Sequence, residues 1–548
     1  MIENMALTSW PGNIAVTPRK SKRAAAKGRL MRVLVLAVPL LFLALGLSAR
    51  EVAITILHTT DVHGRVAEVR SERELKLGGG LLRCATLVRE IRAREPNVIM
   101  VDCGDLFQGS TESFLTSNRI MVSAVQYLRY DALVTGNHEF DGGVKALRQF
   151  YEQAQIPVLA ANIRSAAEPA LPGAQDFLLK ELEGVRVAVV GLTTPIIPLL
   201  SRPPLLDDVT VEDSRKVLHR VMPKVRAAKP DILVLAAHQG LREWGDDSAN
   251  EIKTIARAFP EFDLILGGHT HQAVEWETVN GVSYTQAGKY ALWLGVARLI
   301  FDTQTRRIKS RKIQLLPVDS TVARERALAE QLAKPLQETK QYLDQELGAT
   351  TTELTPTSPH PGQSAIQTLI AAAIAEQAQA QIVFHRPLSE ASLRSGSIKM
   401  RDVWRIVPYD NYIGVAHLTL AELRAILEEN SEYYDSENFR GVYGLTYNLK
   451  IGAAPGTRVA NIRLTGEPKA GRAEQSAPER LRVAFNSYDL ASAGGKLPRL
   501  REIVERRTSR LEERLDANTR DAVIAYLQAH RPLNIEVLPG AQTGDKRK

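Results

Sequence analysis

Cysteine is scarce in this chain of 548 residues: there are two, Cys84 and Cys103, and aromatic residues make up only 6% of the sequence. A fold held by disulfide bonds needs several cysteine pairs, so hydrophobic cores must hold this one. The spacing around Cys84 predicts a helix and that around Cys103 a strand. Both thiols are expected to be buried as small apolar groups, and a single disulfide is the alternative. The length exceeds what one ordinary core supports, which predicts two domains.

Net charge is also low once the start of the chain is set aside. The total formal charge is +8, but the first 32 residues carry seven basic residues and one acidic residue, which leaves only +2 for the rest. A surface that binds nucleic acid needs a concentrated basic patch, so we expect no nucleic-acid partner. Apolar residues at 44% and charged residues at 24% are typical of a soluble globular protein.

Long hydrophobic runs are scarce too, and the one that stands out lies within residues 1–49. A basic segment ending at Arg32 is followed by "VLVLAVPLLFLALG" and then by small residues up to Ala49. This order predicts a secretory signal peptide, because about 14 apolar residues are short of the roughly 20 that span a bilayer. A retained anchor is the alternative, and translation could also begin at Met31. We expect an exported, periplasmic or extracellular protein without stable membrane insertion after cleavage.

Between residues 50 and 320 the sequence alternates between apolar runs and segments of helical spacing. The apolar runs are "AITILHTTD", "NVIMVDCGD", "DALVTGNHE", "PVLAANI", "VRVAVVGLT", "DILVLAAHQG" and "DLILGGHTH". Continuous Val, Ile and Leu runs separated by amphipathic helices predict sheets covered by helices, an α/β domain. Residues 281–302 are expected to add a late β-hairpin.

A change in composition follows this region. Residues 321–350 are polar and favour helix, and "TPTSPHPG" breaks the chain after them, which predicts a helical linker. Residues 351–539 are expected to form a second, α+β domain. Residues 540–548 are expected to be a disordered tail.

Residue types that bind metals come directly after the predicted strands of the first domain. They are Asp61 and His63 after the first strand, Asp105 after the second, Asn137 and His138 after the third, His238 after a later one, and His269 and His271 after the last. Ligand sites in open α/β sheets lie beyond the carboxyl ends of the strands. Residues at i and i+2 of an extended chain point to one side, so each pair is expected to act together. His58 within a strand and His219 within a helix are interpreted as structural.

This donor set predicts a centre with two divalent metal ions. Nitrogen and oxygen donors without thiolate suit Zn²⁺, Mn²⁺, Fe or Co. Seven or more ligands exceed the need of one ion, and two ions about 3.5–4 Å apart with a shared carboxylate are usual in hydrolases. We therefore expect His269 and His271 to bind different ions.

The motifs "LHTTDVHG", "VDCGDLFQGS", "VTGNHEFD", "AAHQG" and "GGHTH", in this order, resemble the five metal motifs of calcineurin-like metallophosphoesterases. More narrowly, the chain resembles the exported 5′-nucleotidase and UDP-sugar hydrolase family over nearly all of its length after the signal peptide. The resemblance implies a metallophosphoesterase β-sandwich flanked by helices, followed by an α+β domain of the 5′-nucleotidase type. It also implies Asp61, His63, Asp105 and His271 as ligands of one metal and Asn137, His238 and His269 as ligands of the other, with Asp105 bridging.

The same resemblance makes His138 and Asp141 a catalytic dyad. Asp141 can orient the His138 ring and favour its charged form, whereas a helix N-cap is the alternative role. The implied reaction is hydrolysis of nucleoside monophosphates by in-line attack of a hydroxide that bridges the metals, a water whose pKa falls to about 7. Activity as a 2′,3′-cyclic nucleotide phosphodiesterase or UDP-sugar hydrolase is the alternative. A non-catalytic nucleotide-binding module is a further one.

The second domain departs from the family pattern in two places. The family has a phosphate-binding arginine at a position that corresponds here to the segment "RPLSEASLR", with Glu390 near the place of the arginine. Arg386 or Arg394 would have to substitute for it. The aromatic residue after the family's "GGDG" element is missing, since this chain reads "AGGKLPRL". Phe439 matches the other base-stacking ring, and Asn486 in "AFNSYDL" is the second expected substrate-binding residue. We expect a monomer that acts on a nucleotide or another small phosphate ester with weak base preference.

Overall fold

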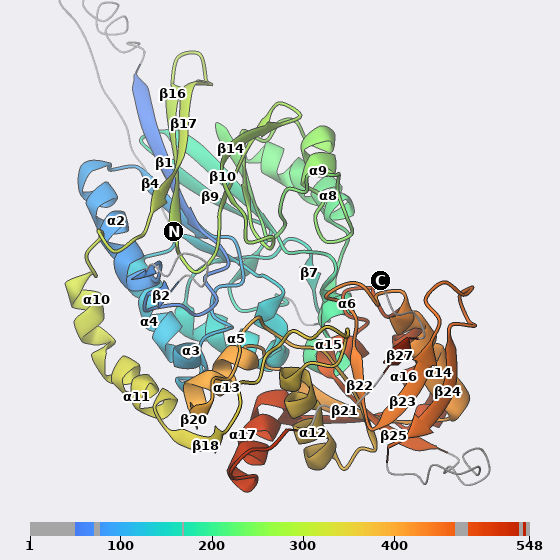
Figure 1. Ribbon diagram of the computed structural model, residues 1–548. Coiled ribbons are helices and arrows are strands. Elements are labelled where there is room, and N and C mark those ends of the chain that lie inside the picture. Colours follow the sequence, from blue (N-terminus) through green and yellow to red (C-terminus); the bar gives the residue numbers. More distant parts are fainter. Residues whose placement is uncertain (1–49, 71–76, 167–168, 466–479, 536–540, 544–548) are drawn as a thin grey trace, which may run out of the picture. The chain divides into compact units, whose positions relative to one another are not determined.

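The computed structural model describes residues 50–70, 77–166, 169–465, 480–535 and 541–543 (Figure 1). The predicted signal peptide, residues 1–49, lies outside the described residues. The chain divides into two compact units, residues 1–51 with 302–307 and residues 52–301 with 308–548, and every predicted site residue lies in the second. None of the helices in the described ranges is both long enough and apolar enough to cross a bilayer.

Two sheets pack face to face in the N-terminal domain. The first has the strand order β17-β16-β1-β4-β5-β6-β8 and the second the order β14-β15-β13-β12-β10-β9. The strands of the first are β1 (Glu51–Thr59), β4 (Val98–Asp102), β5 (Ala132–Val134), β6 (Val158–Leu159), β8 (Ala174–Gln175), β16 (Trp293–Asp302) and β17 (Arg307–Pro317). Those of the second are β9 (Phe177–Leu182), β10 (Val185–Leu192), β12 (Ile232–Ala237), β13 (Leu264–Gly267), β14 (Ala273–Val279) and β15 (Val282–Ala287).

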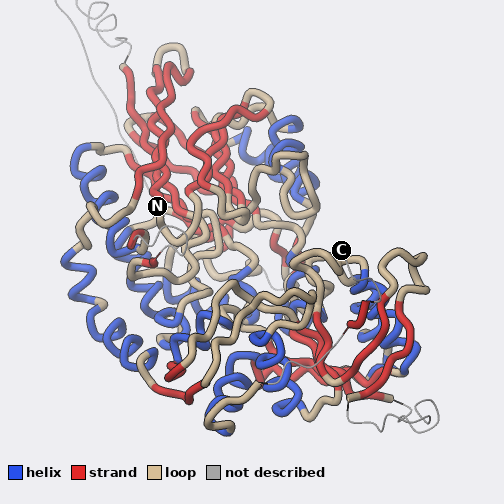
Figure 2. Tube along the Cα trace, in the orientation of Figure 1, coloured by secondary structure: helices blue, strands red, loops and turns tan. Residues whose placement is uncertain are grey.

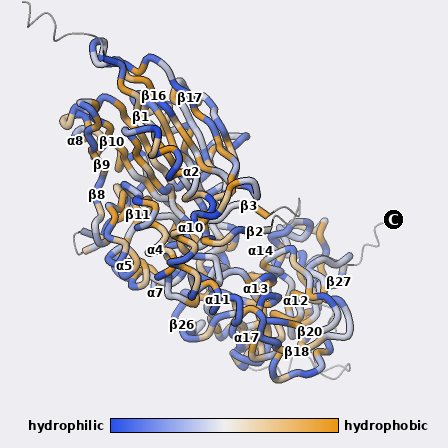
Figure 3. The backbone as a smooth tube through the Cα atoms, turned by 90° about the vertical axis from the view of Figure 1, so that its left-hand side faces the viewer, coloured by the Kyte–Doolittle hydropathy of each residue, from blue (hydrophilic) through white to orange (hydrophobic). Residues whose placement is uncertain are grey.

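Alternating side chains of each sheet enter two different cores. In β4, Val98 and Met100 pack toward helices, whereas Ile99 and Val101 join the core shared by the two sheets. Helices cover both outer faces: α2 (Leu81–Arg94), α4 (Arg119–Leu128) and α5 (Gly143–Ala154) on the first sheet, α8 (Ser214–Ala227) and α9 (Ile252–Ala258) on the second (Figure 2). The short helix α3 (Thr111–Leu115) precedes α4. Burial on both faces explains why these strands are continuous apolar runs (Figure 3). The predicted sandwich flanked by helices is confirmed.

The predicted hairpin at residues 281–302 is wrong. β15 and β16 belong to different sheets: β15 lies between β14 and β13, and β16 lies between β17 and β1. The chain crosses between the sheets through a short turn in which Gly288, Tyr290 and Ala291 have φ values of 70°, 59° and 50°. Two apolar runs joined by a short segment with glycine have the same pattern in a hairpin and in such a crossover, so spacing alone does not separate the two.

The region predicted as a helical linker contains two helices and a strand. Helices α10 (Arg326–Gln331) and α11 (Ala333–Leu343) are followed by β18 (Glu346–Thr350), which pairs with β20 (Gly396–Lys399). Leu328 and Leu332 are buried in the core that contains α2 and α4. These helices are therefore packed against the N-terminal domain.

The C-terminal domain is built on a five-stranded mixed sheet with helices on both faces, which confirms the predicted α+β class. Its strand order is β22-β19-β25-β21-β26, made of β19 (Ile382–His385), β21 (Tyr412–Leu418), β22 (Gly441–Tyr443), β25 (Leu481–Asn486) and β26 (Glu512–Asn518). Helices α12 (Ala365–Ala378), α13 (Met400–Ile406) and α17 (Thr519–Ala529) share one core with it. Helices α14 (Leu420–Ser431) and α16 (Pro498–Val504) share the core on the other face.

Short elements complete the described ranges. They are β2 (Val69–Arg70), β3 (Leu77–Gly78), β7 (Ile163–Arg164), β11 (Thr210–Val211), β23 (Leu445–Leu449), β24 (Val459–Leu464), β27 (Ala541–Thr543), α6 (Ile197–Leu200), α7 (Pro203–Leu206), α15 (Ser487–Leu490) and the 3₁₀ turns His138–Phe140 and Arg507–Ser509. Strand β27 pairs in parallel with β23, so the prediction of a disordered tail is wrong for residues 541–543. The backbone groups at the edge of β23 away from β24 can pair with any extended chain. The side chains of residues 541–543 therefore do not predict this strand. Residues 544–548 lie outside the described part.

His58 and Gly295 fit together inside the first sheet. His58 is fully buried, and neither of its ring nitrogens has a hydrogen-bond partner among the described residues. Burial lowers the pKa of His58 to about 3, so the ring is neutral and packs as part of the core. A Cβ atom at Gly295 would lie 1.9 Å from Cε1 of that ring. The interpretation of His58 as structural agrees with this packing.

We expect Gly295→Ala to lower the free energy of unfolding by about 1–3 kcal/mol, because the added methyl group overpacks a filled core. In a His58→Ala background the same methyl group has room, so the second substitution should cost much less. Urea unfolding of the four forms measures the coupling between the two positions. Strictly additive effects would contradict this packing.

Candidate active site

Loops that follow five parallel strands converge at one edge of the sandwich. β1, β4 and β5 come from the first sheet, and β12 and β13 from the second. Their side chains form two groups: Asp61, His63, Asp105 and His271, and Asp105, His238 and His269, whose donor atoms lie within 4.8 Å of one another in each group. The Oδ1 atom of Asn137 lies 3.1 Å from His238 Nε2 and 2.9 Å from His269 Nδ1. The structure thus brings together all seven predicted metal ligands, with Asp105 in both groups.

The distances between donor atoms match the edges of metal coordination polyhedra. Nε2 of His238 lies 3.2 Å from Asp105 Oδ2, Nε2 of His271 lies 3.4 Å from Asp61 Oδ1, and the Nε2 atoms of His63 and His271 are 3.0 Å apart. Metal–ligand bonds of about 2.0–2.2 Å place neighbouring donors roughly 3.0–3.5 Å apart in octahedral or tetrahedral sites. The mixed nitrogen and oxygen donors suit Zn²⁺, Mn²⁺, Fe or Co. These residues fit two divalent ions that share Asp105.

Burial and neighbouring charges set the pKa values of the side chains at this site. Burial lowers the pKa of His269 to about 3 and that of His271 to about 4, so both rings are neutral at pH 7, the form in which histidine binds metals. Burial likewise raises the pKa of Asp61 to about 7. For His238 burial opposes the charge, but the carboxylate of Asp105 outweighs it and raises the pKa to about 9.

Five of the seven predicted ligands have a left-handed backbone. They are Asp61, His63, Asp105, His269 and His271, with φ between 51° and 69°. Only a few per cent of residues other than glycine adopt this conformation, and each costs on the order of 1–3 kcal/mol unless its surroundings stabilise it. The expectation that each i and i+2 pair lies on one side of an extended chain is therefore wrong. Strands β1 and β13 end earlier, and the ligands lie in tight turns beyond them.

Glycine lets these turns pack directly on one another. A Cβ atom at Gly136 would lie 2.2 Å from Asp105 Oδ1 and 2.3 Å from the backbone nitrogen of the same residue. The loop after β5 therefore touches the loop after β4 without an intervening side chain. This contact places the bridging carboxylate next to Asn137.

Glu139, which the sequence analysis did not single out, holds these two loops together. Its buried carboxylate accepts hydrogen bonds from the backbone N–H groups of Gly136 at 2.7 Å, Asp105 at 2.8 Å, Leu106 at 2.8 Å and Phe107 at 3.3 Å. Burial, together with the charge of Asp105, raises the pKa of Glu139 to about 7. The only signal in the sequence is an acidic residue directly after His138, which says nothing about where its carboxylate points.

The predicted dyad is in hydrogen-bond contact. Nδ1 of His138 donates to Asp141 Oδ2 at 2.8 Å, and the backbone N–H of His138 donates to Asp105 Oδ1 at 2.8 Å. Burial opposes a charge on His138, but Asp141 and Asp105 outweigh it and hold its pKa well above the usual value. Helix α5 begins after Gly142, with no side-chain cap, so Asp141 orients the imidazole and does not serve as the alternative N-cap.

Neither predicted substrate residue of the C-terminal domain has an open surface. Phe439 is 4% exposed and packs edge-on against Tyr434, with ring centroids 5.1 Å apart. Asn486 is 2% exposed; its side chain accepts from the backbone N–H of Asp489 at 2.8 Å and thereby caps α15. Both side chains are thus occupied by packing or capping, and their roles toward substrate remain predictions.

A cationic cluster lies near the carboxyl ends of β19 and β25. Arg386 is half-buried, whereas Arg394 is exposed. Burial lowers the pKa of Lys496, and the charges of Arg440 and Arg386 lower it further, which places these three cations in one region. Arg440 is committed to Asp489 at 2.8 Å. Lys496 lies in "AGGK", the segment in which the expected aromatic residue is missing.

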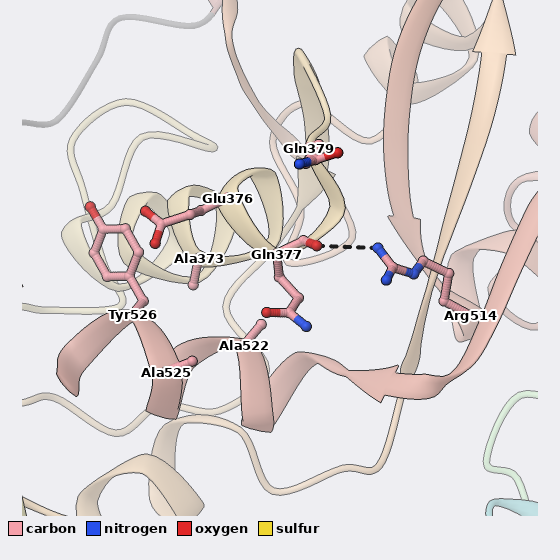
Figure 4. A pocket seen from close by; sticks show the side chains of 8 residues that line it. All are labelled: Ala373, Glu376, Gln377, Gln379, Arg514, Ala522, Ala525 and Tyr526. Atoms are coloured by element: carbon pink, nitrogen blue, oxygen red, sulfur yellow. Dashed lines mark hydrogen bonds between the residues drawn. The ribbon is translucent and has the colours of Figure 1, made fainter. Parts of the chain in front are cut away.

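A separate surface hollow of about 290 Å³ lies between α12 and α17 (Figure 4). Ala373, Ala522 and Ala525 line it, and its acidic residue Glu376 is paired with His530 at 2.9 Å. The residues around it include none of the predicted site residues. We therefore place the active site at the edge of the sandwich.

Two family models match the chain. Residues 54–273 match the calcineurin-like phosphoesterases, and residues 346–502 match the 5′-nucleotidase C-terminal domain. The chain is thus similar to a calcineurin-like phosphoesterase in its N-terminal domain and to a 5′-nucleotidase C-terminal domain in its C-terminal part. The resemblance drawn from the five motifs is confirmed.

Individual relatives agree with this family. The chain is 29% identical to a snake venom 5′-nucleotidase of Crotalus adamanteus over 343 residues, which cover 58% of this chain and 56% of that protein. It is 27% identical to the protein UshA of Yersinia enterocolitica over 465 residues, 76% of this chain and 82% of that one. The crystal structure of a 5′-nucleotidase precursor from Thermus thermophilus has a TM-score of 0.68 at 22% identity, covering 90% of this chain and all of that one. The last comparison shows a common fold.

We expect Glu139→Gln to weaken metal binding about 10- to 100-fold, the usual cost of disturbing residues that orient ligands. An amide nitrogen in place of one carboxylate oxygen would face N–H donors, so the loops after β4 and β5 would separate. Metal retained after dialysis against a graded chelator series measures the effect.

The matched control is Glu325→Gln, which changes a carboxylate bonded to Arg89 and Tyr127 away from the ligand loops. It should retain metal as the wild type does. Equal retention by both variants would show that Glu139 does not position the ligands.

Proposed function

We propose that this protein is a metal-dependent phosphoric ester hydrolase that acts as a 5′-nucleotidase on nucleoside monophosphates. The observation that carries the proposal is the convergence of seven donor residues, Asp105 among them, with the His138–Asp141 pair beside them. Both matched family models support it, and so do the names of the relatives. The alignment with the snake venom protein spans little more than half of that protein, so the activity is proposed here for this chain on its own geometry.

The roles of the residues follow from their chemistry. Two divalent ions held by the seven ligands would supply Lewis-acid charge and lower the pKa of a water molecule toward about 7. Asp141 accepts a hydrogen bond from Nδ1–H of His138 and stabilises the charged ring, in which Nε2 also carries a proton. His138 can then donate this hydrogen bond to a phosphoryl oxygen and stabilise the charge that develops there.

Recognition of the rest of the substrate would fall to the cationic cluster of the C-terminal domain. Arg386 is the better substitute for the missing phosphate-binding arginine, because it is half-buried and its charge lowers the pKa of Lys496, whereas Arg394 is exposed. With Phe439 buried and packed edge-on against Tyr434, stacking of its ring on the base contributes little. The proposed specificity is therefore for phosphate esters with weak preference among bases.

We also propose that the protein is exported and acts as a monomer. The basic segment and apolar run within residues 1–49 support export. The small net charge of the chain after them supports a small-molecule substrate in preference to nucleic acid.

A panel of AMP, GMP, UMP, a UDP-sugar, a 2′,3′-cyclic nucleotide and an aryl phosphate, assayed with and without Mn²⁺, tests the proposal. We expect metal-dependent hydrolysis that is fastest for the monophosphates and differs little among bases. His138→Ala should keep both metals and lose roughly 10²–10⁴-fold in kcat, the usual contribution of a positioned acid–base group.

Asp105→Asn is the companion variant, because it weakens a ligand of both ions. It should lose activity together with bound metal, as measured by elemental analysis. Full metal content in the Asp105 variant, or near-normal kcat in a metal-loaded His138 variant, would refute these assignments.

Arg386→Gln should raise KM for AMP about 10- to 100-fold, since a charge-assisted hydrogen bond contributes about 1.5–3 kcal/mol. Arg394→Gln is the matched control and should leave KM within about twofold of the wild type. Initial-rate kinetics on AMP compare the two variants. A larger effect at Arg394 would reverse the assignment.

A further inference from the structure

An aromatic side chain of the C-terminal domain lies against the imidazole of the dyad. The rings of Tyr409 and His138 are nearly parallel, with an angle of 11° between their planes and 5.8 Å between their centroids. Offset-stacked rings lie about 4.5–7 Å apart. Tyr409 is 43% exposed, so packing in a hydrophobic core does not force this arrangement.

The segment that carries Tyr409 is anchored on both sides. It connects α13 to β21, and the buried guanidinium of Arg520 lies 3.4 Å above the ring of Trp404 in α13. Nε of Arg520 donates to the carbonyl oxygen of Val407 at 3.0 Å, and Nη1 pairs with Asp410. Arg520 therefore holds the carbonyl group of Val407, two residues before Tyr409, and the carboxylate of Asp410, directly after it.

Asn411, two residues after Tyr409, is also anchored. The backbone N–H of Thr519 donates to the carbonyl oxygen of Asn411 at 2.9 Å, and its hydroxyl donates to the same oxygen at 3.2 Å. Ser487 Oγ donates to Asn411 Oδ1 at 3.3 Å. An exposed ring on a segment held in this way has a fixed position, as an accurately placed functional group requires.

Two further contacts hold the imidazole of His138. Asp141 accepts the hydrogen bond from Nδ1 in the ring plane, and His63 makes a T-shaped contact with ring centroids 5.2 Å apart. One hydrogen bond in the ring plane allows the plane to tilt about the line that joins the two groups. A parallel ring against the face of the imidazole restricts that tilt.

We propose that Tyr409 is a positioning residue for the hydrolysis reaction, whose ring fixes the plane of the imidazole that Asp141 orients. The inference rests on the proposed function. It makes the segment 407–411 of the C-terminal domain a part of the active site. The ring would act through His138 and equally for every phosphate ester.

The test compares Tyr409→Leu with Tyr409→Phe, which keeps the stacked ring. With AMP and an aryl phosphate as substrates, Tyr409→Leu should lower kcat about 3- to 10-fold for both, with KM within about twofold and metal content unchanged. Tyr409→Phe should restore kcat to within about twofold of the wild type. Trp276→Leu, at an aromatic residue of β14 that is 48% exposed, is the control for loss of a surface ring and should leave kcat unchanged.

Nuclear magnetic resonance of the histidine ring protons supplies a measurement that does not depend on activity. The carbon-bound ring protons of His138, assigned by their loss in His138→Ala, should show a ring-current shift in the wild type and in Tyr409→Phe that disappears in Tyr409→Leu. Absence of this shift in the wild type would overturn the proposal even if no substrate is hydrolysed. Inactivity of the wild type with the shift present would refute the proposed function and leave the contact established, but without a catalytic role.

Two kinetic outcomes would also overturn the proposal. If Tyr409→Leu raises KM for AMP alone and leaves kcat unchanged, Tyr409 contacts the base of the substrate and does not position His138. If Tyr409→Leu lowers only the unfolding temperature, with both kinetic constants unchanged, its role is structural.

Discussion

One buried carboxylate, that of Glu139, holds together the loops after β4 and β5, on which Asp105 and Asn137 lie. Four backbone N–H groups from two loops point at it, and each of these groups would otherwise be left without a partner where a strand ends. Asp105 has a strained backbone within this arrangement, and the hydrogen bonds stabilise that conformation. The position of Asp105, which belongs to both groups of donor atoms, therefore depends on a residue that belongs to neither.

The two sheets of the sandwich contribute different parts of the same centre. β1 and β4 lead to Asp61, His63 and Asp105. β12 and β13 of the other sheet lead to His238, His269 and His271. Both ligand groups combine residues from the two sheets, so the centre exists only where the sheets meet. Their shared apolar core fixes this meeting point, and the chemistry of the site is thereby coupled to the packing of the whole domain.

The sequence was sufficient for those features that depend on composition and order. Apolar runs buried on both faces located the strands, and polar residues at their ends located all seven donors. It was insufficient where a conformation depends on distant neighbours. The turns at His269 and His271 are left-handed, the carboxylate of Glu139 points inward, and Phe439 is covered by Tyr434. None of these follows from the spacing of residues along the chain, because each is set by contacts with segments that are remote in the sequence.

The two cysteines are unpaired and fully buried, in α2 and directly after β4. Burial raises the pKa of the Cys84 thiol to about 12 and holds that of Cys103 well above its usual range, so neither forms the thiolate that reacts with oxidants or alkylating reagents. In the folded protein both thiols are therefore protected from oxidation. Its thiols become reactive only when the first sheet separates from the helices and the second sheet, so covalent labelling of either one reports the opening of the N-terminal core.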